Sequence, residues 1–148
     1  MELKRFLQTA VALELAAEET YLALTEAMAR HSNRDAAEFF REMAGYCALH
    51  RETAMERAGI TSIDGIQRDL AEAVSAAREA PAPGDVGNVD LEQAMSLALL
   101  AEQNGLNFYL RVAESTEDAQ LRAIASDFVD EERGHIHALE RFLGHRPY

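Results

Sequence analysis

Long stretches without glycine or proline restrict this chain to helical folds more strongly than any other feature of its sequence. Between Glu2 and Arg30 neither residue type occurs, and apolar side chains recur at every third or fourth position. Such spacing places them along one face of a helix. This apolar stripe includes Leu3, Leu7, Ala10, Tyr21 and Met28. The chain is therefore predicted to begin with a long amphipathic helix.

A short polar break at residues 31–33 separates this helix from a second one. Asn33 or Asp35 can cap the second helix, because a short polar side chain accepts hydrogen bonds from the free amides of the first turn. Gly59 then provides a C-terminal stop. Together the two helices predict a hairpin over about residues 2–58.

A second hairpin is predicted over about residues 90–143. Asp90 and Gln93 have the spacing of a capping box, in which each side chain bonds the backbone of the other residue, at the start of a third helix. Ser115 or Thr116 is predicted to open the fourth helix after a tight turn.

The crossover between the hairpins, about residues 59–89, has a different composition. A weaker helical pattern covers about residues 66–79, and prolines and glycines then prevent regular structure. Each tight turn makes its two helices antiparallel, whereas a long crossover can carry the chain back along the bundle. The second and third helices are then parallel, as in ferritin-like four-helix bundles. We predict an all-α, ferritin-like bundle in which residues 1–148 form a single domain.

The charge balance excludes several classes of partner. Lys and Arg total 14 against 26 Asp and Glu, which gives a formal net charge of −12. A surface of that sign repels phosphate groups, so we expect neither nucleic acid nor an anionic membrane as a partner. The sequence has no apolar run long enough to span a bilayer and no pattern of a secretory signal peptide. We therefore expect a cytoplasmic protein.

The two hairpins contain an internal repeat of polar residues. A glutamate in the first helix of each hairpin is followed seven residues later by a tyrosine, and a histidine lies in the second helix three residues after a cysteine or a glutamate. The pairs are Glu14–Tyr21 and Glu102–Tyr109, then Cys47–His50 and Glu132–His135. On a helical wheel, the glutamates and histidines of this repeat interrupt the apolar stripe of their helix.

These polar residues are also predicted to lie at similar depth in the bundle, because their distances from the turns are similar. An unpaired carboxylate in an apolar core costs several kcal/mol, so a compensating partner is needed. The simplest is a divalent metal, and mixed carboxylate and imidazole ligands suit iron or manganese. A Glu-x-x-His motif presents both side chains on one helix face, although alone it is a weak signal. The alternative is a buried polar network without metal.

The duplicated motif resembles the rubrerythrin-like branch of the ferritin-like superfamily, whose members carry a carboxylate-bridged di-iron centre. The family has a glutamate on helices one and three and Glu-x-x-His on helices two and four. Carried over position by position, the metal ligands are Glu14, His50, Glu102, Glu132 and His135. The resemblance implies iron, with manganese or zinc as alternatives, a reaction with peroxide or oxygen, and a homodimer. Exchange of hairpins between the two subunits stays open.

The chain departs from the family pattern in two ways. Cys47 stands where the first Glu-x-x-His motif has its glutamate. It is also the only cysteine, which excludes an intramolecular disulfide and the cysteine-ligated rubredoxin module of full rubrerythrins. Any electron donor is therefore expected to be a separate protein.

The cysteine leaves several alternatives open. Cys47 can ligate as a thiolate, or Glu18, one turn after Glu14, can supply the lost carboxylate. Otherwise one metal position is lost, and Cys47 is a small buried hydrophobe. Glu131 is the main rival to Glu132, but the duplicated spacing favours Glu132.

Two tyrosines complete the predicted site. Tyr21 and Tyr109 are placed to hydrogen-bond the metal-binding carboxylates, or otherwise to bond any acceptor in the core. Three functions follow from these patterns: a rubrerythrin-like oxidoreductase, a metal storage, buffering or sensing protein without turnover, and a structural bundle that has lost its metal.

Overall fold

The chain forms four long helices and no strand within residues 1–63 and 86–144, the part that this computed structural model describes. The helices are α1 (Leu3–Arg30), α2 (Arg34–Ala58), α4 (Leu91–Ser115) and α5 (Ala119–Gly144). The helical pattern predicted over residues 66–79 lies outside the described residues. The predicted all-α class is confirmed.

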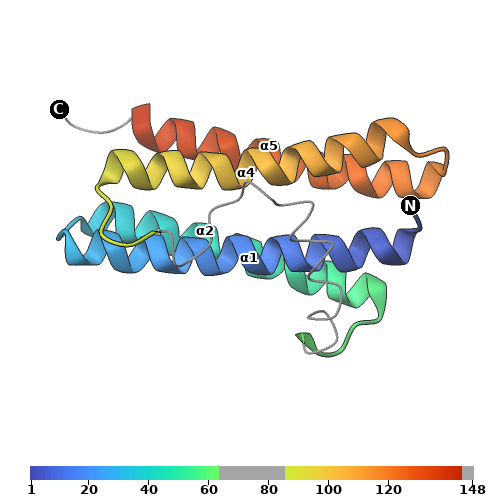
Figure 1. The fold of residues 1–148 in the computed structure, drawn as a ribbon, viewed down its shortest axis with the longest axis horizontal. Coiled ribbons are helices and arrows are strands. Elements are labelled where there is room, and N and C mark those ends of the chain that lie inside the picture. The colour runs from blue at the N-terminus through green and yellow to red at the C-terminus, as the bar shows by residue number, and fades with distance from the viewer. Residues whose placement is uncertain (64–85, 145–148) are drawn as a thin grey trace.

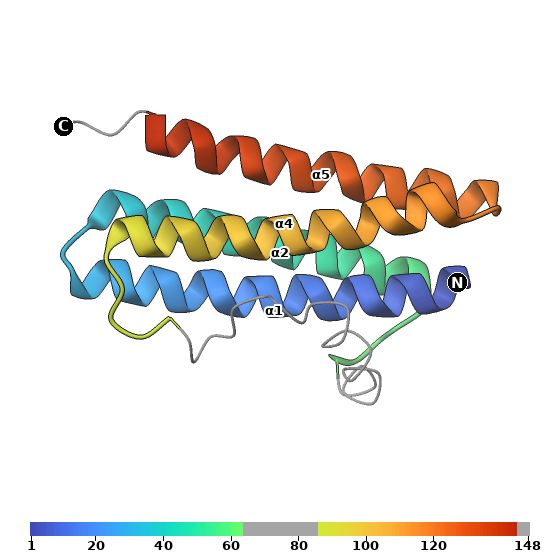
Figure 2. The same ribbon diagram turned by 45° about the horizontal axis from the view of Figure 1, so that its top comes forward.

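Two antiparallel hairpins, α1–α2 and α4–α5, pack side by side along their length (Figure 1). Helices α2 and α4 run in the same direction, and the view in Figure 2 shows the same arrangement. The ferritin-like connectivity is therefore confirmed. Helix α1 packs against α4, and α2 faces α5, where the rings of Phe39 and Phe142 stack at 4.4 Å.

Local signals set most helix ends as predicted. The Asn33 side chain accepts a hydrogen bond from the Ala36 amide at 3.1 Å, so Asn33 is the cap of α2. Gly59 ends that helix with φ +68°, a left-handed conformation that glycine adopts without steric cost. The predicted capping box of Asp90 and Gln93 is present at the start of α4.

The predicted start of the last helix is wrong. Helix α4 continues to Ser115, and the Thr116 amide still donates to the Val112 carbonyl, so neither residue is free to open α5. Asp118 takes that role, because its Oδ1 accepts hydrogen bonds from the amides of Gln120 at 2.9 Å and of Leu121 at 3.3 Å.

The apolar core has two parts with a polar layer between them. One part contains a cluster of aromatic rings around Phe6, and the other lies around Tyr21 and Leu24. Along each helix, the glutamates and histidines of the repeat fall between these parts. The layer is therefore closed by apolar packing at both ends.

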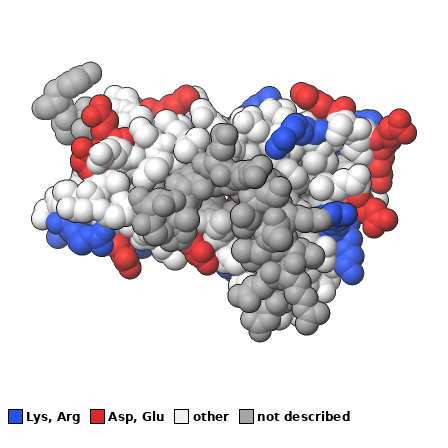
Figure 3. All heavy atoms as spheres, viewed as in Figure 1, with Lys and Arg blue, Asp and Glu red and all other residues white. Residues whose placement is uncertain are grey.

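None of the four helices combines the length and the apolar character needed to cross a bilayer. Among the described residues on the face in Figure 3, acidic and basic side chains occur at both ends of the bundle.

The capping box predicts the effect of one substitution. Asp90→Ala removes the acceptor for the Gln93 amide, 2.8 Å away, and should lower the free energy of unfolding by about 1 kcal/mol. Asp90→Asn keeps an acceptor and should unfold close to the wild type. Urea unfolding followed by circular dichroism measures both; equal stability of the two variants would contradict this role.

Candidate metal centre

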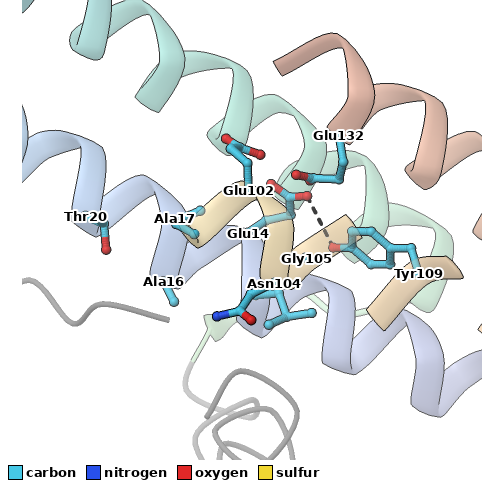
Figure 4. A pocket seen from close by; sticks show the side chains of 11 residues that line it. Glu14, Ala16, Ala17, Thr20, Glu102, Asn104, Gly105, Tyr109 and Glu132 are labelled. Carbon is cyan, nitrogen blue, oxygen red and sulfur yellow. Dashed lines mark hydrogen bonds between the residues drawn. The ribbon is translucent and has the colours of Figure 1, made fainter. Parts of the chain in front are cut away.

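Three carboxylates and one imidazole meet in the polar layer of the core. Glu14 of α1 and Glu102 of α4 are each 2% exposed, and Glu132 and His135 of α5 are also buried. Figure 4 shows the three carboxylates close together, each from a different helix. His50 of α2 lies at the edge of the group, with 18% of its side chain exposed. The structure thus brings the five predicted ligands to one region.

The two predicted tyrosines cross-link the hairpins in a reciprocal way. Tyr21 of the first hairpin donates to Glu102 Oε1 of the second at 2.6 Å. Tyr109 of the second hairpin donates to Glu14 Oε1 of the first at 3.3 Å (Figure 4). Glu14 and Glu102 therefore each accept a hydrogen bond from a buried tyrosine in the other half of the chain.

The two histidines present their Nδ1 atoms to carboxylates. His135 Nδ1 lies 3.3 Å from Glu102 Oε2, and His50 Nδ1 lies 3.9 Å from Glu14 Oε1. The rings stack on each other, with centroids 4.9 Å apart. His50 Nδ1 is buried and has no hydrogen-bond partner among the described residues.

Burial and mutual repulsion make the carboxylates share protons. Burial raises the pKa of Glu14 to about 7, and it also raises the pKa of Glu132, with the charges of Glu102 and Glu14 adding to the effect. Burial acts on Glu102 too, but hydrogen bonds from Glu132, His135 and Tyr21 outweigh it and lower the pKa. Glu102 is therefore the most acidic of the three.

The two histidines respond in opposite directions. Burial and the neighbouring His135 lower the pKa of His50 to about 4, so His50 is neutral at pH 7 and its approach to Glu14 is no ion pair. Burial disfavours a charged His135 as well, but the hydrogen bond with Glu102 and the nearby carboxylates raise its pKa. A neutral imidazole with a free Nδ1 is the form that binds metal.

Cys47 lies at the same centre. It is 1% exposed, and its Sγ, a Glu102 oxygen and a His135 nitrogen all lie within 4.8 Å of one another. Burial, followed by the charges of Glu14 and Glu102, raises the pKa of the thiol. A bound cation reverses this preference, because a coordinating thiol loses its proton. Both predicted roles of Cys47, ligand and buried hydrophobe, agree with this position.

Two further acids, Glu18 and Glu131, were candidate ligands in the sequence analysis, and the structure shows what each of them contacts. Glu18 pairs with Arg51, whose Nε and Nη2 donate to Glu18 Oε2 at 3.2 and 3.1 Å. Glu132 is buried, whereas its rival Glu131 is 44% exposed, yet Glu131 Oε2 lies 3.4 Å from His50 Nδ1.

A small pocket adjoins the carboxylates. It has a volume of about 30 Å³ and is lined by the three glutamates and by small residues of α1 and α4 (Figure 4). Gly105 leaves room here, since a Cβ at this position would lie 3.4 Å from Glu132 Oε2. Asn104 also lines the pocket, and its Nδ2 has no hydrogen-bond partner among the described residues. Such a volume holds molecules about the size of water.

The residues fit a metal ion on their own chemistry. Oxygen donors of three carboxylates and nitrogen donors of two imidazoles converge from all four helices, and one of those nitrogens lacks a partner. A cation in this position would neutralise carboxylates that otherwise hold protons against their ordinary pKa.

Comparison with known proteins identifies the family. A family model described as rubrerythrin matches residues 5–143, which include every predicted ligand. The chain belongs to the rubrerythrin family. Among solved structures, it is similar to an uncharacterised conserved protein from Magnetospirillum magnetotacticum MS-1, with a TM-score of 0.77 and 26% identity over 100% of this chain and 97% of that one. No curated protein matches it.

The two tyrosine hydrogen bonds of this rubrerythrin-family chain differ in length, so their removal should lower the free energy of unfolding by different amounts. Tyr21→Phe leaves a buried carboxylate oxygen without its 2.6 Å donor and should lower the free energy of unfolding of the metal-free protein by about 1–3 kcal/mol. Tyr109→Phe removes a 3.3 Å bond and should cost less. Denaturant unfolding after chelator treatment gives both values; a larger loss in Tyr109→Phe would reverse the assignment.

Glu14 predicts a pH dependence. Its pKa is about 7 in the folded protein and about 4.5 in the unfolded chain, so the folded state binds the proton more tightly. Its contribution to stability is greatest at low pH and falls as the pH rises from about 4.5 to 7, by up to about 3 kcal/mol.

The substitution Glu14→Gln isolates this contribution. Both proteins are measured free of metal, and the free energy of unfolding of Glu14→Gln is subtracted from that of the wild type. This difference should fall as the pH rises from 4.5 to 7. The exposed Glu114→Gln on α4 serves as the control and should follow the wild type. Unfolding titrations across this range test it, and a difference that rises with pH would refute the raised pKa.

Proposed function

We propose that the protein is a rubrerythrin-like non-haem metal protein that holds two iron ions and reduces peroxide or oxygen. The observation that carries this proposal is the convergence of Glu14, Glu102 and Glu132 with two histidines in the core, one of which has an unpartnered Nδ1. Family membership supports it.

The side chains have separate tasks in this proposal. Glu14, Glu102 and Glu132, which contact one another, would hold the ions together with the two histidines. Iron supplies reversible one-electron chemistry when bound. Because the pKa values of Glu14 and Glu132 are raised by burial, metal binding is expected to release protons.

The surroundings favour a small substrate. The pocket of about 30 Å³ next to the carboxylates has space for a molecule of the size of water or hydrogen peroxide. Tyr21 and Tyr109 fix the glutamate oxygens by hydrogen bonds, and the apolar packing on both sides of the layer limits access of water.

The reaction requires a partner for electrons. Reduction of hydrogen peroxide to two water molecules consumes two electrons and two protons, and the chain has no cysteine-rich module to deliver the electrons. We infer that a separate protein supplies them. A homodimer stays part of the proposal, as the family resemblance implies.

Metal binding is the first test. Protein purified without chelator should contain iron by elemental analysis, and chelator should lower the melting temperature, because a ligand at 100 times its Kd stabilises by about 2.7 kcal/mol. Glu102→Ala should lose the metal, whereas Glu114→Ala, exposed on the same helix, should retain it. Metal retained in full by Glu102→Ala would exclude this ligand set.

Turnover separates an enzyme from a binding protein. Ferrous-loaded protein mixed with peroxide should oxidise much faster than free ferrous ion, as followed by stopped-flow absorbance. Oxidation no faster than that of free iron would favour metal storage or sensing, which the replacement of a family glutamate by Cys47 makes the second candidate.

A further inference from the structure

More predicted ligand atoms lie near His135 than near His50. On the His135 side, Glu102 lies at 3.3 Å and Cys47 belongs to the same compact group of ligand atoms. On the His50 side, the nearest predicted carboxylate is Glu14, at 3.9 Å. The family motif has a glutamate at position 47, so the centre as a whole has one carboxylate fewer, and on the His50 side only Glu14 among the predicted carboxylates lies within 4 Å of Nδ1.

One acid outside the family motif lies nearer to His50. Glu131 Oε2 is 3.4 Å from His50 Nδ1, yet this nitrogen has no hydrogen-bond partner among the described residues. Bonds of about 2.1 Å to one divalent ion place two donor atoms about 3.0–3.4 Å apart at angles between octahedral and tetrahedral. The pair therefore has the spacing of two ligands of one ion without being hydrogen-bonded.

The internal repeat explains why Glu131 reaches this histidine. The offset that relates His50 to His135 relates Tyr46 to Glu131. The Tyr46 ring stacks against His135 at 6.2 Å, and Glu131 approaches His50 in the same way from the other half. Equivalent positions of the two hairpins therefore each contact the histidine of the other hairpin. Position 46 places a tyrosine ring against His135, and position 131 places a carboxylate near His50.

The surroundings of Glu131 leave room for a ligand. A cavity of about 240 Å³ lies between α2 and α5 and is lined by His50, Arg57 and the acids Asp127, Asp130 and Glu131. The half-exposed Glu131 side chain can adjust its position there. Glu18, the other candidate replacement, already forms two hydrogen bonds with Arg51.

We propose that Glu131 is a metal ligand of this chain and completes, with Glu14 and His50, the metal position on the His50 side. This inference rests on the proposed function, because it assumes that the centre binds metal. Glu131 would thus supply a metal-binding carboxylate in place of the glutamate that the family motif has at position 47.

Cobalt titration tests the assignment without any enzymatic reaction. Co²⁺ is added to chelator-treated full-length protein, and binding is followed by calorimetry and visible absorption. The wild type should bind two ions, and Glu131→Gln should weaken the second by about 100-fold or more. Asp130→Asn removes the same charge from the same cavity and should leave both affinities within about threefold, since Asp130 is an exposed residue of the cavity wall, where solvent screens its charge.

Each outcome decides between the two proposals. Two ions bound with unchanged affinity in Glu131→Gln would overturn the role of Glu131 while the metal centre stands. One ion in the wild type would overturn both that role and the second metal position of the proposed function. No cobalt bound by the wild type would overturn the proposed function itself. Equal weakening by Asp130→Asn would show that only charge matters and would also overturn the ligand assignment.

A second variant tests whether Glu131 replaces the lost carboxylate. Cys47→Glu restores the family motif, so adding Glu131→Gln in that background should cost much less cobalt affinity than in the wild type. Circular dichroism verifies that both proteins are folded. An equal loss in both backgrounds would contradict the compensation.

Discussion

Burial of carboxylates inside an apolar bundle is the constraint on which the rest of this structure depends. Glu14, Glu102 and Glu132 are almost completely shielded from water, and they raise one another's free energy through repulsion. The protein offsets this cost with protons, tyrosine hydroxyls and imidazoles. A bound cation would offset the cost more directly, because it would neutralise the carboxylate charges.

The centre is almost symmetric, and two positions of the repeat break the symmetry. Each hairpin donates one tyrosine hydrogen bond to a glutamate of the other. In the internal repeat, however, Cys47 of the first hairpin stands at the position of Glu132, and Tyr46 at the position of Glu131. These two exchanges shift oxygen donors toward α5. In the two-metal centre that we propose, unequal halves would give the two positions different affinities, so that one ion could be held while the other exchanges.

The sequence was sufficient for the fold because its determinants are local. Apolar periodicity predicted the helices, and Asn33, Gly59 and the Asp90–Gln93 pair predicted three of their ends. The start of α5 failed because Ser115, Thr116 and Asp118 are all capable caps, and only the continuation of α4 decides among them. The predicted ligands do converge, but a helical wheel gives no rotation of one helix against another. It could therefore foresee neither the pairing of Glu18 with Arg51 nor the approach of Glu131 to His50.

The reciprocal tyrosine bonds also bear on how the molecule assembles. Each hairpin carries an acid that accepts a hydrogen bond from a tyrosine of the other hairpin, so each half lacks one partner of its own buried group. Folding is then expected to be cooperative across the whole bundle instead of proceeding half by half. The same reciprocity would be preserved if an ancestral two-helix peptide had paired with its own copy, which makes duplication and fusion a natural origin for the repeat.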